Sequence, residues 1–474
     1  MGANEALSPK GRLSFRVAHQ LPALENVLFL ACVLEIGGRI QAYRNRLGQE
    51  TSFSYHFQNS GEGSIFRDGH TYRDWCMYQR DVLDHDPGPT HVLEVDVADF
   101  YARISFHRLE NLLDQVAPRD GAVRFIKKQI KAIRARQSFG LPVGGSASRL
   151  LAELALTDTD QALADRQIRS TRYVDDFRIL VRSEREAYDV AAFIAEQLGI
   201  SEGLSLNAAK TRIYSREAYR EWLDSIIPNV EDVAGESAIE QLTSSIYFDM
   251  EPDEEEIEAL RNVNILEYLD VEIQRHIHDT GRVRTIFRAL RIILPLDAIG
   301  YIRQNFEVLT LYSKELCLLM QGVATRMPGC FDDMGIRIVG EILRPPASSV
   351  QVMRSWLIEL FVRGIVSPTQ DTVRQLEPLS SVSDRRQILL IRGRIGDINF
   401  FRRNKTAVTH FAPQDRACLV LGGSCLPEDE YNSWLGAVRP LFNTPLGGLF
   451  LAWARRNRGV IFNRLTWHAD DHPD

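Results

Sequence analysis

Two adjacent aspartates, Asp175 and Asp176, lie at what the sequence indicates is a tight turn between two short runs, residues 168–172 and 177–181. Neighbouring carboxylates repel each other and lower the propensity for β-structure, so keeping such a pair beside core strands costs free energy. A bound divalent cation would offset that cost. The tetrapeptide Tyr173–Asp176 alone is equally compatible with a turn on the protein surface.

The length and composition limit the class of protein. A chain of 474 residues exceeds one ordinary core, so two or three domains are expected. No run of about 18 uncharged apolar residues exists, and the apolar run 27–33 is soon followed by Glu35 and Arg39, which excludes a membrane span or signal peptide there. The six cysteines are scattered without a C-x-x-C pair, so neither a zinc site nor a disulfide framework is indicated. A cytoplasmic location with reduced thiols is therefore predicted.

The charge is unevenly distributed along the chain. A net charge of −7 argues against a general nucleic-acid binder. Within the basic segment 124–136, however, Lys127, Lys131 and Arg134 have the spacing of one helix face. Such a stripe on an acidic protein is a candidate for binding nucleic-acid phosphates, and a solvated helix face is the alternative.

Hydrophobic periodicity predicts an α+β first half. A helix over 23–46 and a strand over 52–57 precede a break at 87–89. The later predictions are a strand at 91–97, helices at 108–115, 122–136 and 146–163, the hairpin around Asp175, a helix at 183–198, and strands at 204–207 and 211–214. That order is typical of a small antiparallel sheet backed by helices.

From about residue 250 the pattern becomes helical, with predicted helices at 283–294, 298–320 and 350–362. An all-α domain follows from this, and stacked helical hairpins of the solenoid kind are one arrangement for it, although the sequence contains no clear repeat. The predicted domains are 1–89 (an N-terminal helix followed by short irregular strands), 90–249 (the sheet and its helices) and 250–474 (the helical domain).

A third carboxylate, Asp96, lies 79 residues before Asp175, near the end of its own predicted strand. Three aspartates on neighbouring strands are what two-metal phosphoryl transfer requires, with two Mg²⁺ ions about 4 Å apart. Asp96 and Asp175 would share the ions, and Asp176 would be a secondary ligand. The backbone carbonyl of Val97 would complete an octahedral oxygen shell.

Four segments resemble motifs A, B, C and D of reverse transcriptases, in the order of that family: 96–101, 140–148, 173–176 and 203–211. The resemblance covers roughly residues 50–215 and implies a fingers–palm core. It also implies that Asp96, Asp175 and Asp176 bind two Mg²⁺ or Mn²⁺ ions, that the substrates are dNTPs, and that the partners are an RNA template or noncoding RNA and the DNA product.

The resemblance implies further roles, each with a plainer alternative. Tyr101 falls at the steric gate that would exclude a ribose 2′-hydroxyl, and a core aromatic is its alternative. Lys210 matches the lysine that would protonate pyrophosphate, and a surface lysine is its alternative. The predicted contacts to the dNTP are the backbone at Asp99 and Phe100, Gly144, and Arg73 in preference to Arg67 and Arg80.

Two departures and the helical domain point to one branch of the family. Phe139 and Val143 stand where motif B commonly has glutamine, which puts ordinary template handling in doubt. A palm followed by a helical domain resembles the abortive-infection, defence-associated reverse transcriptases of bacteria. That branch implies anti-phage defence, protein-primed or untemplated DNA synthesis, and homo-oligomers. The candidate priming tyrosines are Tyr247, Tyr268, Tyr301, Tyr312 and Tyr431.

Two other functions stay open on the sequence alone. An RNA-synthesising palm polymerase would use the same carboxylates, and Tyr101 is the residue that argues against it. A catalytically vestigial scaffold, whose helical domain binds a phage protein or RNA, would not need the intact set of three aspartates.

Overall fold

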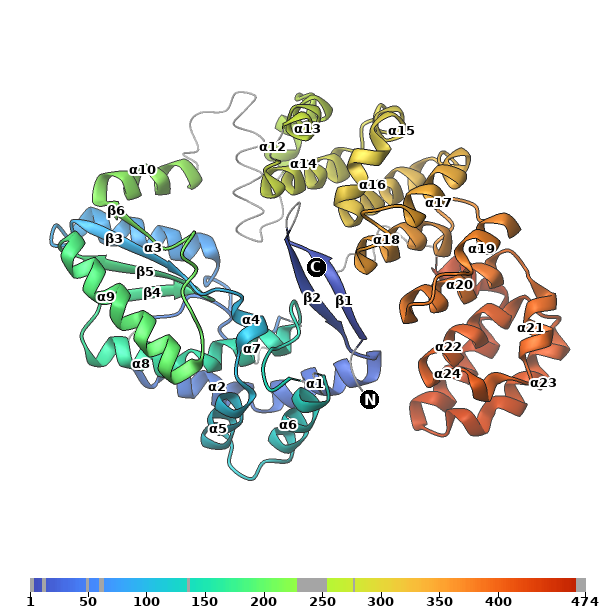
Figure 1. Cartoon of the computed structure of the whole chain (residues 1–474), viewed down its shortest axis with the longest axis horizontal. Helices are drawn as coiled ribbons and strands as arrows, with labels where there is room; N and C mark the ends of the chain where they lie inside the picture. The colour runs from blue at the N-terminus through green and yellow to red at the C-terminus, as the bar shows by residue number, and fades with distance from the viewer. Residues whose placement is uncertain are drawn as a thin grey trace. The chain divides into compact units, whose positions relative to one another are not determined.

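The structure, a computed structural model, describes residues 4–10, 14–47, 51–58, 64–133, 137–227, 254–275 and 278–465 (Figure 1). The chain divides into two compact units: Met1–Glu5 with Val17–Glu256, and Ala6–Arg16 with Ile257–Asp474. The predicted boundary between 249 and 250 lies outside the described residues, and the predicted division at 89 stays untested. Within the described ranges no helix is both long and apolar enough to cross a bilayer.

The first unit is built on a four-stranded antiparallel sheet with the order β4–β5–β3–β6 (Figure 1). The strands are β3 (His91–Asp96), β4 (Ser170–Tyr173), β5 (Asp176–Val181) and β6 (Arg212–Ser215). The strand predicted at 91–97, the hairpin around Asp175 and the strand at 211–214 are thereby confirmed.

Both faces of this sheet are covered by helices. Successive side chains of β3 point to opposite faces and therefore enter two different hydrophobic cores. Leu93 and Val95 belong to the larger core, whereas Val92 belongs to the smaller one with Trp75 and Leu223. The larger core is covered by α1 (Ala23–Glu35), α2 (Gly37–Arg44), α5 (Phe106–Val116), α6 (Gly121–Ile133), α7 (Ser146–Ala155), α8 (Thr157–Asp165) and α9 (Glu184–Gln197). The smaller core is covered by α3 (Tyr72–His85) and α10 (Arg216–Ile226).

Several predicted elements differ from the structure. The helix predicted at 23–46 is divided at Ile36, where a Cβ on Gly37 would lie 2.7 Å from the Phe57 ring. The helix predicted at 146–163 is likewise divided, at Leu156. The strands predicted at 52–57 and 204–207 are wrong, since both segments form only isolated β-bridges. The polar–aromatic alternation at 52–57 has another cause, namely buried polar side chains that bond elsewhere.

Besides the helices at 100–103 and 216–226, two elements within residues 4–90 were not predicted, and the first is α3. Thr71 caps α3 by accepting from the Asp74 amide while the Asp74 carboxylate accepts from the Thr71 amide. The other is a hairpin of β1 (Asn4–Pro9) and β2 (Phe15–Gln20), whose residues 6–16 belong to the second unit.

Apart from those hairpin residues, every element of the second unit that the structure describes is helical, as predicted. Four successive pairs of even-numbered helices pack together, in the manner of stacked helical repeats: α14 with α16, α16 with α18, α18 with α20, and α20 with α22. The α-helices are α12 (Glu254–Arg261), α13 (Ile265–Gln274), α14 (Thr280–Ile293), α15 (Ala298–Leu309), α16 (Ser313–Arg326), α17 (Gly335–Leu343), α18 (Gln351–Val362), α19 (Gln370–Leu376), α20 (Val382–Arg394), α21 (Ile398–Asn404), α22 (Pro413–Gly422), α23 (Glu428–Val438), α24 (Pro445–Arg456) and α25 (Ile461–Leu465).

Contacts between the stacked helices explain why they lie close together. The buried Arg354 of α18 pairs with Asp384 of α20 at 2.9 Å. At the crossing of α20 and α22, a Cβ on Gly393 would lie 2.5 Å from the Cα of Gly422, so the crossing requires glycine. The helix predicted at 298–320 is two helices, α15 and α16, joined by a 3₁₀ turn at Thr310–Tyr312.

Candidate active site

The three aspartates meet at one end of the sheet. In the antiparallel register of β3 and β5, Asp96 lies opposite Asp176. Asp175 immediately precedes β5, and its carbonyl oxygen accepts a hydrogen bond from the Val97 amide at 3.3 Å. The sheet therefore brings together residues that are far apart in the sequence and holds their backbones on paired strands.

Asp96 is bound by residues of the segment after α9. Lys210 Nζ donates to Asp96 Oδ1 at 2.9 Å, and Asn207 Nδ2 donates to Asp96 Oδ2 at 2.7 Å. The Asn207 amide also donates to the Asp96 carbonyl oxygen at 2.8 Å. Burial alone would lower the pKa of Lys210, but the hydrogen bond to Asp96 and the nearby aspartates outweigh burial and raise it. Lys210 therefore keeps its proton.

The other two aspartates carry poorly compensated charge. Burial and then the charges of Asp176 and Asp96 raise the pKa of Asp175 to about 7. Burial also raises the pKa of Asp176 to about 6; the charge of Arg178 opposes this shift and that of Asp96 adds to it. An additional positive charge at this end of the sheet would stabilise both ionised carboxylates.

Within the described residues, no three His, Cys, Asp or Glu side chains are grouped closely enough to hold a metal ion as they stand. Both oxygens of Asp96 are directed to Lys210 and Asn207 instead. The donor chemistry nevertheless fits a hard divalent cation, because two half-buried like-charged carboxylates with raised pKa values and the buried Asp96 on the paired strand present oxygen ligands.

The turn that carries Asp175 has an unusual backbone. Val174 has a φ of +57°, in the left-handed region that a β-branched residue rarely adopts. Two buried side chains hold it there: Ser54 Oγ accepts from the Val174 amide at 2.8 Å, and Arg172 Nη1 donates to its carbonyl oxygen at 2.8 Å. The side chains that fix this peptide thus fix the position of Asp175.

Those side chains belong to a buried polar network centred on Glu153, which is fully buried in α7. Glu153 accepts hydrogen bonds from Arg172 at 2.9 Å, Arg44 at 2.9 Å, Ser52 at 2.7 Å and Ser54 at 2.5 Å. Burial would raise the pKa of Glu153, but the two guanidinium charges and the hydroxyl hydrogen bonds outweigh burial and lower it.

The network was not predicted from the sequence. Arg172 also binds Asp160 of α8, with its Nη2 2.8 Å from Asp160 Oδ2. The one available signal was a glutamate on the apolar face of a predicted helix, beside Leu150, Leu151 and Leu154. A charge in that place requires buried partners.

The residues predicted to bind the dNTP lie on both sides of the aspartates. Asp99, with a φ of +48°, precedes α4 (Phe100–Arg103), whose Phe100 side chain is buried in the core. Burial, and then electrostatic interactions with Tyr55, Glu153 and Asp175, raise the pKa of Tyr101. Gly144 has a φ of +103°, and a Cβ at this position would meet open space, so its backbone conformation rather than crowding requires glycine.

Comparison with known proteins identifies this domain. Residues 44–258 match the family "Reverse transcriptase (RNA-dependent DNA polymerase)". These residues form a reverse transcriptase domain. The match spans the sheet, the three aspartates and the Glu153 network. The chain thus contains a reverse transcriptase nucleotidyltransferase domain, and a helical region follows this domain in the sequence.

Solved structures give weaker similarities. Apo telomerase from Candida tropicalis is 14% identical, with 75% of this chain and 68% of that chain covered and a TM-score of 0.35. Telomerase from Candida albicans in complex with a fragment of telomeric RNA is 12% identical, with 75% and 66% covered and a TM-score of 0.34. No curated protein matches the sequence.

Outside the aspartates, the reverse transcriptase domain offers several cations. Arg73 lies in the first turn of α3, next to Tyr72, whose ring contacts that of Tyr173 at 5.3 Å. Arg80, by contrast, pairs with Asp224 at 3.3 Å. Arg73 is thus next in sequence to a residue whose ring contacts Tyr173, two positions before Asp175.

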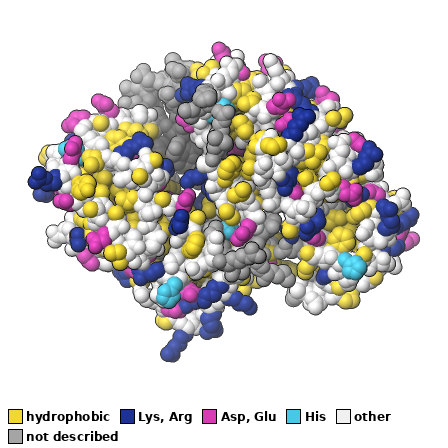
Figure 2. Space-filling model, in the orientation of Figure 1, with side chains coloured by type: hydrophobic (Ala, Val, Ile, Leu, Met, Phe, Trp, Pro, Cys, Tyr) yellow, Lys and Arg dark blue, Asp and Glu magenta, His cyan; other side chains and the backbone are white. Residues whose placement is uncertain are grey.

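The predicted basic stripe on α6 is partly neutralised. Lys127 pairs with Asp114 at 2.5 Å and Lys131 with Glu110 at 2.7 Å, and Arg134 lies outside the described residues. Figure 2 shows basic side chains gathered over α5 and α6 at the lower edge of the visible face. The exposed cations at one-face spacing on α6 are Arg124, Lys128 and Lys131.

The priming candidates differ in accessibility. Tyr431 is fully buried and donates to the Val420 carbonyl at 3.1 Å, and Tyr312 is mostly buried with its hydroxyl 3.0 Å from His278 Nδ1. Tyr268 and Tyr301 are half-buried, and Tyr247 lies outside the described residues.

Proposed function

We propose that the reverse transcriptase domain makes DNA from dNTPs at a two-metal site formed by Asp96, Asp175 and Asp176, with the Val97 carbonyl as a further ligand. The observation that carries this proposal is the pairing of Asp96 with Asp176 beside a third carboxylate, the half-buried Asp175, whose pKa is raised. Bound Mg²⁺ or Mn²⁺ ions would activate the primer hydroxyl and neutralise the leaving pyrophosphate. Lys210, which keeps its proton, would hold the proton that pyrophosphate takes up.

The test is incorporation of labelled dNTPs by the purified protein with Mg²⁺ or Mn²⁺. We expect the double variant Asp175→Ala, Asp176→Ala to lose incorporation, whereas Asp189→Ala, an exposed aspartate on α9, should retain it. Equal incorporation by the wild type and the double variant would contradict the proposal.

Tyr101 is proposed as the residue that selects the sugar, with Arg73, Gly144 and the backbone at Asp99 and Phe100 holding the triphosphate. The place of Tyr101 in α4, five residues after Asp96 and directly after Asp99 and Phe100, supports this assignment. A Tyr101→Ala variant that gains rNTP incorporation agrees with it. A wild type that prefers rNTPs, unchanged in Tyr101→Ala, would instead identify an RNA-synthesising enzyme.

The nucleic-acid partner is proposed to contact α6 through Arg124, Lys128 and Lys131. Their exposed, one-face arrangement supports the proposal. Lys131 is paired with Glu110 but its side chain is 64% exposed, whereas that of Lys127, paired with Asp114, is 22% exposed. Removing one phosphate contact should reduce the slope of log K against log salt by about 0.7 for a single strand or about 0.9 for a duplex. Unchanged slopes in Lys128→Ala and Lys131→Ala would contradict it.

We propose a role in anti-phage defence, with synthesis that is protein-primed or untemplated in a homo-oligomer. The support is the helical unit after the reverse transcriptase domain together with the substitutions Phe139 and Val143. Cells should lose phage protection with Asp96→Asn; protection that persists would favour the scaffold alternative. Protease digestion of copurifying DNA should leave a tyrosyl peptide, and the partly exposed Tyr268 and Tyr301 are favoured over the buried Tyr431.

A further inference from the structure

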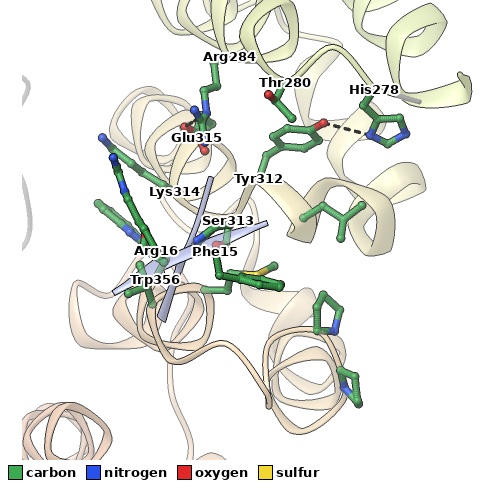
Figure 3. A pocket seen from close by; sticks show the side chains of 17 residues that line it. Phe15, Arg16, His278, Thr280, Arg284, Tyr312, Ser313, Lys314, Glu315 and Trp356 are labelled. Atoms are coloured by element: carbon green, nitrogen blue, oxygen red, sulfur yellow. Dashed lines mark hydrogen bonds and ion pairs between the residues drawn. The ribbon is translucent and has the colours of Figure 1, made fainter. Parts of the chain in front are cut away.

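The second unit contains a pocket of about 560 Å³ that is separate from the three aspartates of the reverse transcriptase domain (Figure 3). Residues 8–9 and 15–16 of the β1–β2 hairpin form one part of its wall. The rest of the wall is formed by His278 and the start of α14, the turn and helix start at 311–315, the two prolines at 345–346, and one side of α18. A volume of this size is within the usual range for small-molecule sites.

The charged side chains of the pocket are mostly cationic. Arg16, Arg284 and Lys314 line it, and Glu315 is the one carboxylate among the lining residues. Glu315 is engaged by Arg284, with Glu315 Oε1 3.4 Å from Arg284 Nε. Three cations and one carboxylate leave two positive charges in excess.

Those two charges are available to a ligand. In the described part of the chain, neither Arg16 nor Lys314 has an ion-pair partner, and both are exposed at the pocket. Burial and then the charge of Arg284 lower the pKa of Arg16, which indicates that two guanidinium groups repel each other across this wall. An anion bound by Arg16 would relieve its repulsion by Arg284.

The remaining wall is aromatic and apolar. Phe15 is 45% exposed, and Trp356 of α18 also lines the pocket. Tyr312 lies on the same wall, hydrogen-bonded to His278 at 3.0 Å, as the dashed line in Figure 3 marks. Tyr312 is 6% exposed, whereas Phe15 and Trp356 are more accessible, and accessible aromatic faces stack on the planar rings of nucleobases.

We propose that this pocket binds a nucleoside phosphate, with the phosphate held by Arg16 and Lys314 and the base against Phe15 and Trp356. A free nucleotide and the phosphorylated 5′ end of a nucleic acid present the same chemistry. The site lies outside the residues that match the reverse transcriptase family, so it does not depend on the proposed two-metal site.

The test is photo-crosslinking of the full chain with 8-azido-ATP in EDTA, followed by peptide mapping and affinity measurement. We expect the label in peptides that contain residues 14–16, 311–315 or 351–356. Arg16→Ala and Lys314→Ala should each weaken binding at least about tenfold, because each removes a charge-assisted hydrogen bond. The control is Arg374→Ala, an exposed cation elsewhere in the second unit, which should bind as the wild type does.

Competitors separate the two parts of the ligand and its two sources. Pyrophosphate and adenosine should each compete more weakly than ATP. Phe15→Ala should weaken competition by adenosine and leave competition by pyrophosphate unchanged. A 5′-phosphorylated oligonucleotide that competes better than ATP would identify a nucleic-acid end as the source. Labelling that persists in the Asp175→Ala, Asp176→Ala variant distinguishes this site from the palm. Label found only within residues 44–258, or undiminished affinity in Arg16→Ala, would overturn the proposal.

Discussion

Replacing Glu153 by glutamine should loosen the turn that carries Asp175. The substitution nearly preserves shape, so it leaves no cavity, but it removes the negative charge that Arg172 and Arg44 share. Breaking a buried ion pair by changing one partner costs about 3–5 kcal/mol. Asp160 still compensates Arg172, so we expect the lower end, about 3 kcal/mol.

Amide hydrogen exchange across residues 170–181 measures this effect where it acts. A local loss of about 3 kcal/mol corresponds to exchange that is roughly 100-fold faster for amides that exchange through local opening. The Val174 amide is the most direct reporter, because its acceptor Ser54 Oγ is itself bound to Glu153. The rate of dNTP incorporation should fall in parallel, since Asp175 follows Val174.

A matched control is Glu430→Gln, which makes the same chemical change on a carboxylate that also binds two cations, Arg402 and Lys405, at the surface. That variant should leave exchange in residues 170–181 unchanged. If Glu153→Gln alters exchange there by less than about threefold, the network does not hold the turn and the reasoning is refuted.

Three further predictions concern single groups. Metal-free Asp175→Asn should be more stable than the wild type at pH 8 by about 2 kcal/mol. The pKa of Asp175, raised from 3.8 to about 7, sets an upper limit of about 4 kcal/mol, which partial solvent screening roughly halves. Denaturant unfolding at pH 8 and pH 4 tests this, because the gain in stability should vanish near pH 4. Burial and then the charge of Arg44 lower the pKa of His56 from 6.5 to about 4. The neutral ring therefore supports folding above pH 6.5, and up to about 3 kcal/mol of the free energy of unfolding is lost as the pH falls toward 4. His56→Gln should remove that part of the acid sensitivity, and equal acid sensitivity in the variant and the wild type would contradict this prediction. Finally, Tyr101→Ala should raise the ratio of rNTP to dNTP incorporation. An unchanged ratio would assign Tyr101 a packing role.

The sequence was sufficient for features that depend on local pattern. The alternating pattern of residues 91–97 predicted β3, and apolar residues on either side of a turn predicted the hairpin around Asp175. The position of Asp96 on a neighbouring strand then followed from motif order, and the register of β3 with β5 agrees with it.

Features that depend on long-range partners were beyond one sequence. Arg44 and Glu153 are 109 positions apart, and nothing in either segment indicates that they pair. The segment 52–57 was predicted as a strand because polar and aromatic residues alternate in it. The polar residues Ser52 and Ser54 instead bind Glu153, a partner that the segment itself does not indicate. The membership of residues 6–16 in the second unit has no local signal at all.

The left-handed Val174 has a consequence for the order of folding. A hairpin with a β-branched residue at a φ of +57° does not favour its own closure, because that conformation costs of order 1–3 kcal/mol before any partner is present. The partners of the Val174 peptide come from residue 54 and, through Arg172, from α7 and α8. The β4–β5 hairpin is therefore expected to close late, after those helices have docked. A nascent or partly folded chain would then lack the geometry for catalysis until its core is complete.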